Sequence, residues 1–388
     1  MPSRDRQQVV DRLAARIGLP VVLEDAAQQP LAHSPHHDLT DRMRQDTILR
    51  HATSSEVVAH FRPYRLTERT EPFLVPGEGE DLLPRWCVPL RHEGRTLGFL
   101  WVLLPAPETT EPLRAAAAEA ATELATSLAT EDRVRRAESA LVVDLLLGDA
   151  EAREAAGRAV ADRGSFPPGR RLAVAVCTGA AWGTPAVRSR FWQVGWAPPG
   201  GHHLGAVTDR EGISLCTAAD APAATEAVTG ALQRLCTRIG DDRLVVGIGD
   251  AVDGPGQAHR SHRQARRAAW VAASTPGLPV AAWADLGVER YLTSLPAEEL
   301  AAAVDPRVRR LVDASAELVP TVERYVAAAG AIAPVAEALH IHRTTLYHRL
   351  EVAGRCGLDL RKGADRTVVD VGLRALRLLG THPGAGPP

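Results

Sequence analysis

The side chains best suited to specific chemistry lie in one short run near the carboxyl end of the chain. The run comprises His342, Arg343, Thr344, Thr345, Leu346, Tyr347, His348 and Arg349. Hydroxyl and imidazole groups can reach base edges in DNA, and guanidinium groups bind phosphate oxygens. A recognition helix needs both kinds of group at its first turns, because only its amino-terminal end inserts deeply into the major groove. The run therefore indicates a DNA-binding helix.

Positive charge is concentrated around this run, although the chain as a whole is slightly acidic. The 388 residues carry 45 Lys and Arg against 47 Asp and Glu, a net charge of −2, so a nucleic-acid contact has to be local. Residues 340–362 provide such a patch, since Glu351 and Asp359 are outnumbered by five basic residues, Arg343, Arg349, Arg355, Arg361 and Lys362. A helical bundle with a solvated arginine face is the alternative interpretation.

The elements that must position the run are three short helices. We expect the first to follow Pro320 and to end near Ala329, where Gly330 breaks it. The next two span 332–339 and 342–353, which is the spacing of a helix-turn-helix.

The apolar pattern of these helices predicts which side chains face outward. Small Ala336 suits a close helix crossing, and the expected buried positions are Leu339, Ile341, Leu346 and Leu350. The last helix then presents Arg343, Thr344, Tyr347 and His348 outward, with His342 at its start and Thr345 and Arg349 towards its flanks.

The segment from Ala336 to Gly380 resembles the C-terminal helix-turn-helix of PucR-family transcriptional regulators. The matching positions are Ala336, Leu339, His342-Arg343, Thr345-Leu346, Arg349-Leu350, Gly357 to Leu360, and Asp365-Arg366. The resemblance implies operator binding by seven residues, His342, Arg343, Thr344, Thr345, Tyr347, His348 and Arg349. The family usually has Asn at position 344 and Gly-Asn at 330–331. Thr344 lacks the amide that pairs with adenine, so we expect a different operator sequence.

An α/β pattern precedes this unit. We expect a strand at 171–177, a hairpin of strands 204–207 and 212–216, a helix at 222–238, a strand at 244–249 and a helix at 258–273. The stretch resembles the degenerate GGDEF-like domain of PucR/CdaR-type regulators. Active diguanylate cyclases carry Gly-Gly-Asp/Glu-Glu-Phe on the hairpin, whereas the turn here is 209–212, Asp-Arg-Glu-Gly. We therefore expect no enzyme activity. The Trp-rich segment 181–203 resembles an insertion of unexplained purpose.

The amino-terminal part combines short helical and strand patterns. Strands 21–23 and 31–33 form an expected hairpin, and strands 86–90 and 96–103 form an expected pair. The pattern Val88-Pro89-Leu90 followed by Leu97-Gly98 resembles late strands of a GAF domain, which implies a sensor domain. A small mixed domain of another kind is the alternative. The Ala, Glu, Arg and Leu composition from Leu113 onward predicts a long helix.

These expectations define a multidomain α+β and α/β chain. The expected parts are a GAF-like sensor domain at 1–112, a connecting or dimerisation helix at 113–165, a degenerate GGDEF-like domain at 166–295, a linker helix at 296–319, an all-α helix-turn-helix domain at 320–380 and a disordered tail at 381–388.

Several chemistries are disfavoured by composition. Lys362, the only lysine, is followed by Gly363, so neither a P-loop nor a protein-kinase lysine is present. The five cysteines form no Cys-x-x-Cys pair and indicate buried thiols in a reducing compartment. No apolar stretch is long enough to span a bilayer, and the start of the chain has no signal core.

Three further patterns have an ordinary and a functional interpretation. The histidines around 33–37, with His51 and His60, form a polar loop more readily than a metal site. Gly247-Ile248-Gly249-Asp250 lacks the third glycine of a dinucleotide fingerprint. Four arginines on one helix, Arg260, Arg263, Arg266 and Arg267, form either a solvated salt-bridged face or a second anion contact.

The sequence thus predicts a cytoplasmic transcriptional regulator with neither cofactor nor metal. Its expected partners are double-stranded operator DNA, a second copy of the chain in a homodimer or larger oligomer, and a small-molecule effector that biases the spacing of two DNA-binding domains. A signalling enzyme of the nucleotide-cyclase type and an interaction adaptor that does not bind DNA are the alternatives.

Overall fold

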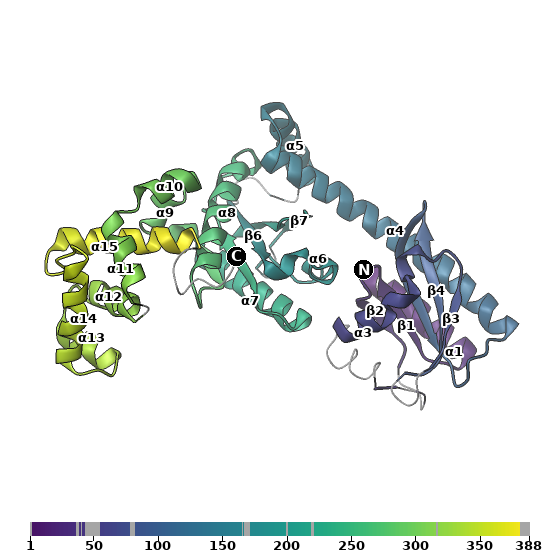
Figure 1. Ribbon diagram of the computed structural model, residues 1–388. Helices are drawn as coiled ribbons and strands as arrows, with labels where there is room; N and C mark the ends of the chain where they lie inside the picture. Colours follow the sequence, from purple (N-terminus) through teal and green to yellow (C-terminus); the bar gives the residue numbers. More distant parts are fainter. Residues whose placement is uncertain are drawn as a thin grey trace.

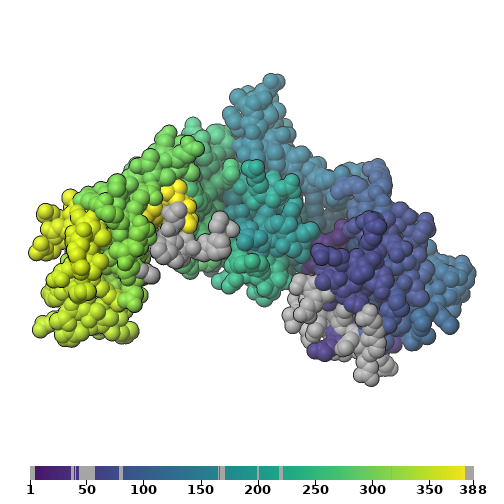
Figure 2. Space-filling model, viewed as in Figure 1, coloured from purple at the N-terminus to yellow at the C-terminus, as the bar shows by residue number. Residues whose placement is uncertain are grey.

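The computed structural model arranges the chain as three lobes in a row (Figures 1 and 2). It describes residues 2–35, 39, 41–42, 55–77, 82–164, 166, 171–198, 201–218, 221–315 and 317–380. The expected tail and the histidines at 36, 37 and 51 lie outside these residues. No helix in the described part of the chain is long and apolar enough to cross a membrane.

The amino-terminal lobe is a five-stranded antiparallel sheet in the order β2-β1-β5-β4-β3. Its strands are β1 (Val21–Asp25), β2 (Pro30–His33), β3 (Phe73–Val75), β4 (Arg85–His92) and β5 (Arg95–Leu103). Both expected strand pairs are confirmed. Successive side chains of β5 point to opposite faces of the sheet and so contribute to two cores. On one face, Leu100 and Val102 pack against helices α1 (Pro2–Ile17) and α4 (Glu111–Leu147). On the other face, Phe99 and Trp101 pack against α3 (Ser55–Phe61) and the short turns η1 (Arg62–Tyr64) and η2 (Leu66–Glu68).

Helix α4 joins the amino-terminal and central lobes (Figure 1). Its amino-terminal half buries Leu124 and Leu128 against the first sheet, and its last turns bury Val142 and Leu145 in the central lobe. At 37 residues it is about 55 Å long. Gly148 ends it, and Asp149 caps a separate helix, α5 (Ala150–Asp162). The segment 113–165 is therefore two helices.

The central lobe is a second five-stranded sheet, ordered β10-β9-β6-β8-β7. Its strands are β6 (Arg171–Gly179), β7 (His203–Val207), β8 (Gly212–Ala218), β9 (Leu244–Ile248) and β10 (Val280–Ala282). The expected hairpin is confirmed as β7 and β8. Along β6, Leu172, Val174 and Val176 face α8 (Ala258–Ser274) and the end of α4, whereas Ala175 and Cys177 face α7 (Ala221–Ile239). Both faces are covered, as the small and β-branched residues of β6 require.

The Trp-rich segment, for which the sequence suggested no purpose, is part of the central core. It forms the short turn η3 (Ala180–Gly183) and helix α6 (Pro185–Phe191). Trp182, Phe191 and Trp196 are almost fully buried and pack with the apolar side of α7. Gly212 allows this packing, because a Cβ there would lie 2.3 Å from the Trp182 ring. The three rings thus fill one face of the second sheet.

The carboxy-terminal lobe is all helical. Its helices are α9 (Glu289–Leu292), α10 (Ala297–Ala303), α11 (Pro306–Ala314), α12 (Leu318–Ala327), α13 (Ile332–Ala338), α14 (Arg343–Arg355) and α15 (Gly363–Leu378); the turns η4 (Pro255–Gln257) and η5 (Trp283–Asp285) flank α8 and β10. The segment 296–319, expected as one linker helix, is two helices, because Asp305 caps a new start at Pro306. Leu300 and Leu311 are buried in the same core as α12 and α15, so this segment belongs to the lobe.

Candidate nucleic-acid interface

Helices α13 and α14 form the helix-turn-helix expected from the sequence. Gly330 (φ +90°) separates α12 from α13, and His340 (φ +51°) adopts the left-handed conformation between α13 and α14. Val335, Ala336 and Leu346 are buried where the helices meet. Leu339, Ile341 and Leu350, expected to be buried, are only half-buried, although they pack against the same core. The packing of the two helices directs one side of α14 outward.

The predicted contact residues at the start of α14 face solvent. Arg343, Thr344, Thr345, Tyr347 and His348 are exposed, and Tyr347 keeps 51% of its surface accessible despite its aromatic ring. No hydrogen bond or ion pair to another part of the described chain occupies Arg343, Tyr347 or His348. A groove-reading surface requires donors that are free in this way.

His342 is the amino-terminal cap of α14. Its Nδ1 accepts from the Thr344 amide at 3.4 Å and lies 2.9 Å from the Thr344 hydroxyl. The cap holds one otherwise unpaired amide of the first turn, and it also fixes the orientation of the imidazole ring. His342 therefore has a structural role in addition to its place on the exposed side.

Arg349 differs from the other predicted contact residues. Its guanidinium donates to the Thr321 hydroxyl at 2.9 Å and to the Glu317 carboxylate at 2.6 Å. Only 23% of the side chain is accessible, so the group ties α14 to the beginning of α12. The sequence pattern cannot reveal this pairing, because Glu317 lies 32 positions away.

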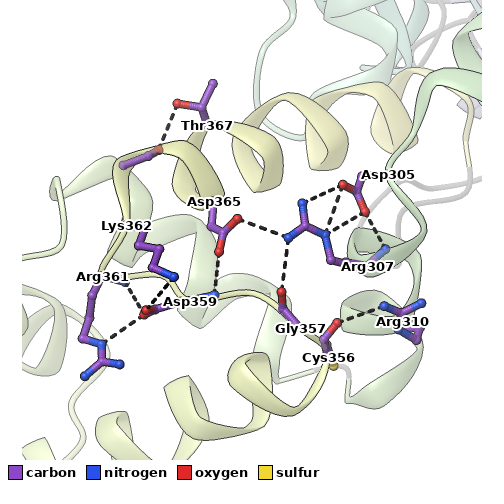
Figure 3. Close-up of polar contacts among 11 residues, drawn as sticks. Asp305, Arg307, Arg310, Cys356, Gly357, Asp359, Arg361, Lys362, Asp365 and Thr367 are labelled. Atoms are coloured by element: carbon purple, nitrogen blue, oxygen red, sulfur yellow. Dashed lines mark hydrogen bonds and ion pairs between the residues drawn. The ribbon is translucent and has the colours of Figure 1, made fainter.

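The turn between α14 and α15 is held by a polar network drawn in Figure 3. Arg307 of α11 pairs with Asp305 at 2.8 Å and with Asp365 at 3.2 Å, and it donates to the Gly357 carbonyl. Asp365 also accepts the Asp359 amide at 2.8 Å. No local sequence pattern identifies Arg307 as a functional residue. The local signal for this network is Asp305, which comes before Pro306 and caps the start of α11. The network holds the carboxyl end of α14 in place.

Basic side chains continue from this turn along α14. A groove of about 1100 Å³ runs beside the helix from Tyr347 to the turn, and its walls include Arg355, Arg361 and Lys362. Arg361 and Lys362 are 88% and 71% accessible and share the Asp359 carboxylate. Three of the five basic residues predicted for 340–362 thus line this groove, together with the acidic residues Glu351, Asp359 and Asp365.

The other sequence candidates have structural explanations. Gly247 and Gly249 allow α8 to cross β9, since a Cβ at either would lie 2.0 Å from a backbone oxygen of α8. In the β7–β8 hairpin, Glu211 pairs with His262 at 3.0 Å and Arg266 at 3.2 Å, and Asp209 pairs with Arg188. Among the described residues, no three His, Cys, Asp or Glu side chains converge as metal ligands would.

The cysteines are reduced in this structure. Cys87, Cys177, Cys216 and Cys356 are buried, and Cys236 is half-buried. Burial raises the pKa of the Cys216 thiol to about 12, so this thiol stays protonated at neutral pH.

Two family comparisons match separate parts of the chain. Residues 318–375 match the PucR C-terminal helix-turn-helix domain, and residues 148–271 match the GGDEF-like domain. The first match covers α12 to α15, and the second begins at the end of α4 and extends through most of α8. The helix-turn-helix and GGDEF-like resemblances drawn from the sequence are confirmed. No curated protein matches the chain.

Solved structures of low similarity include a regulator and a second bacterial protein. A regulator of polyketide synthase expression from Bifidobacterium adolescentis is 19% identical, with 57% of this chain and 91% of that chain covered and a TM-score of 0.23. PelD from Pseudomonas aeruginosa PAO1 is 19% identical, with 63% and 82% covered and a TM-score of 0.20. These scores are too low to support a conclusion about the arrangement of the three lobes.

Proposed function

Since the chain belongs to the PucR/CdaR family of transcriptional regulators, we propose that it binds operator sites in double-stranded DNA through the first turns of α14. The observation that carries the proposal is that Arg343, Tyr347 and His348 are exposed and unpaired within the described chain, beside a groove whose walls include Arg355, Arg361 and Lys362. Thr344 and Thr345 add hydroxyl groups at the same end of the helix. Together they supply groups for base edges and for phosphates.

We further propose that the protein acts as a homodimer or larger oligomer and responds to a small-molecule effector. The amino-terminal sheet, with helices on both faces, serves as the sensor domain, of GAF type, within the predicted range 1–112. Helix α4 is suited to transmit a change in this sensor domain to the central lobe, because the helix is buried in both lobes. Two α14 helices spaced by the dimer would read two half-sites.

The central lobe is proposed to be regulatory and without catalytic activity. Glu211 of its hairpin is paired with His262 and Arg266, and the turn lacks the Gly-Gly-Asp/Glu-Glu-Phe motif with which a nucleotide cyclase holds its metal. Metal-dependent turnover of a nucleoside triphosphate by the purified chain would contradict this part of the proposal.

The test is selection of bound fragments from sheared genomic DNA with the purified protein, followed by affinity measurements at several salt concentrations. Arg343→Ala is expected to lose the enriched sites and to lower the salt slope of the affinity by about one per protomer, because one phosphate contact disappears. Arg210→Ala is the matched control: it removes the same charge from an exposed position in the central lobe.

Two results would decide against DNA binding. One is the absence of enrichment in the presence of cell extract as a source of effector. The other is an equal loss of affinity in the Arg343→Ala and Arg210→Ala variants. Either result would favour an interaction adaptor whose helix-turn-helix binds a protein.

A further inference from the structure

A second basic surface lies in the central lobe, away from α14. It is a groove of about 540 Å³ between the corner of α4 and α5 and the exposed side of α8. Its walls are Leu146, Leu147, Arg153, His259, His262, Arg263, Arg266, Arg267 and Trp270. The two elements belong together, because α8 and α4 pack on the same face of the second sheet. The arginines are therefore gathered by tertiary packing around a concave surface.

The charge of this groove is largely uncompensated. Glu211 accepts from His262 and Arg266, and Arg153 donates to the Gly148 carbonyl at 2.8 Å. Arg263 and Arg267 have neither a hydrogen bond nor an ion pair within the described part of the chain. No carboxylate is among the described wall residues. The salt-bridged face considered in the sequence analysis is thus limited to Arg266.

The positive charge around the groove also disfavours protonation of one imidazole in its wall. The pKa of His259 lies below its usual value, first because of burial and then because Arg153, Arg260 and Arg263 disfavour a further positive charge. A bound anion would relieve this repulsion.

The shape and lining of the groove select one class of ligand. Its volume is within the range of small-molecule sites, about 300–1000 Å³. Arginine is suited to phosphate, because its planar guanidinium can donate two parallel hydrogen bonds. Leu146, Leu147 and Trp270 make up the apolar part of the walls, and Leu147 keeps 52% of its surface accessible. We propose that this groove binds a phosphorylated small molecule, with its phosphates against Arg263 and Arg267 and its apolar part against Trp270.

A ligand in this groove would lie against elements that are connected to all three lobes. The wall residues of α4 and α5 belong to the helical connection from the amino-terminal lobe, and those of α8 belong to the central sheet. Trp270 donates from Nε1 to the Leu378 carbonyl at the end of α15, at 3.0 Å. Neighbouring Val271 is buried in the core of the carboxy-terminal lobe. The regulatory consequence, a change in operator affinity, rests on the proposed function, whereas binding of the ligand does not.

Binding is tested by isothermal titration of the full chain with ATP and with inorganic tripolyphosphate, without DNA. We expect saturable binding of both, with ATP the tighter, because its base can contact the apolar wall. The double variant R263A/R267A is expected to bind ATP at least tenfold more weakly. The matched control R133A/R210A removes two exposed arginines that are outside the groove and is expected to stay within about twofold of the wild type.

A third variant tests the same groove from its other wall. Leu147→Glu places a carboxylate at an exposed rim position and leaves every arginine intact. It is expected to weaken ATP and tripolyphosphate binding, and it keeps the proposal testable if R263A/R267A does not fold.

Several results would overturn the proposal. The absence of saturable binding by the wild type, or an equal loss in R263A/R267A and R133A/R210A, would show that the groove holds no specific anion. If tripolyphosphate bound as tightly as ATP, the proposed contact between the ligand and the apolar wall would be wrong. If ATP does not bind and R263A/R267A instead loses affinity for DNA, the arginines contact the DNA backbone. Because the titration contains no DNA, failure of operator binding leaves its result unaffected.

Discussion

Arginine side chains of this protein take different roles according to the partners that the fold supplies. Arg343 is exposed at the start of α14, and Arg349, one and a half turns later, is held by Thr321 and Glu317. Arg307 makes three separate contacts that secure the turn after α14. The residue type therefore does not define the function, because a guanidinium with satisfied donors has little capacity left for phosphate.

Arg349→Ala is predicted to affect stability more than DNA affinity. It removes the hydrogen bonds to Thr321 and Glu317, and we expect a loss of about 1 kcal/mol of unfolding free energy, since the pair is partly solvated. Urea denaturation followed by circular dichroism measures this loss. The salt slope of DNA affinity should remain that of the wild type. A slope reduced as in Arg343→Ala would show that Arg349 leaves its partners to contact phosphate.

At the scale of elements, helix α8 organises the central lobe. Ala265, Ala268 and Ala269 face the sheet, and Gly247 of β9 lies directly beneath them. A run of small residues on both elements allows an unusually close approach of helix and strand. The opposite side of α8 carries the arginines of the proposed anion groove, so the same helix contributes to the core and to a candidate site.

Gly247→Ala is predicted to destabilise the central lobe. A Cβ at this position would lie 2.0 Å from the Ala265 carbonyl oxygen and 2.1 Å from the Ala269 amide nitrogen, so α8 would have to shift. Overpacking of this kind costs about 1–3 kcal/mol or more. Thermal unfolding of the full chain measures the effect. Gly256→Ala, where a Cβ meets no atom within 4 Å, is the control, and equal melting temperatures for the two variants would contradict the packing argument.

At the scale of the whole molecule, the amino-terminal and central lobes meet at a polar contact besides sharing α4. Ser189 of α6 donates to Asp25, and Arg190 donates to Gln29 at 3.2 Å. Neighbouring Glu24 accepts from the Trp101 indole at 2.9 Å. The Trp-rich segment thus links the core of one lobe to the first hairpin of the other. Acidic groups taken out of water at such a contact make it sensitive to pH.

Glu24→Gln is predicted to change the pH dependence of stability. Burial is the main cause that raises the pKa of Glu24 to about 8 from its ordinary 4.5. The folded chain therefore keeps a proton that the unfolded chain releases, and stability falls as pH rises from 4.5 through about 8.

Melting temperatures between pH 5 and 8 test this prediction. The melting temperature of the wild type should fall further over this range than that of Glu24→Gln, whose amide oxygen can still accept the hydrogen bond from Trp101. Glu71→Gln, at an exposed position, is the control and should follow the wild type. Parallel curves for Glu24→Gln and the wild type would show that Glu24 is ionised in the folded protein.

The elements were predictable from the sequence because their signals are local. Apolar alternation identified the paired strands at 86–103, and Gly330 marked the break before α13. The exposed side of α14 followed from four positions expected to be buried: Leu346 is buried, whereas Leu339, Ile341 and Leu350 are half-buried against the same core. A helix-turn-helix is compact in sequence, so most of the candidate interface could be identified in this way.

Contacts between distant segments decided the rest. Only the tertiary structure places the Trp-rich segment in a core, joins α10 and α11 to the carboxy-terminal lobe and ties Arg349 to α12. It also brings Arg153 into one groove with Arg263 and Arg267, which follow it by more than a hundred residues in the sequence. The physical reason is that burial and ion pairing depend on which surfaces of the fold meet. The periodicity of one segment indicates which of its own faces is apolar, but it does not indicate which other segment packs against that face.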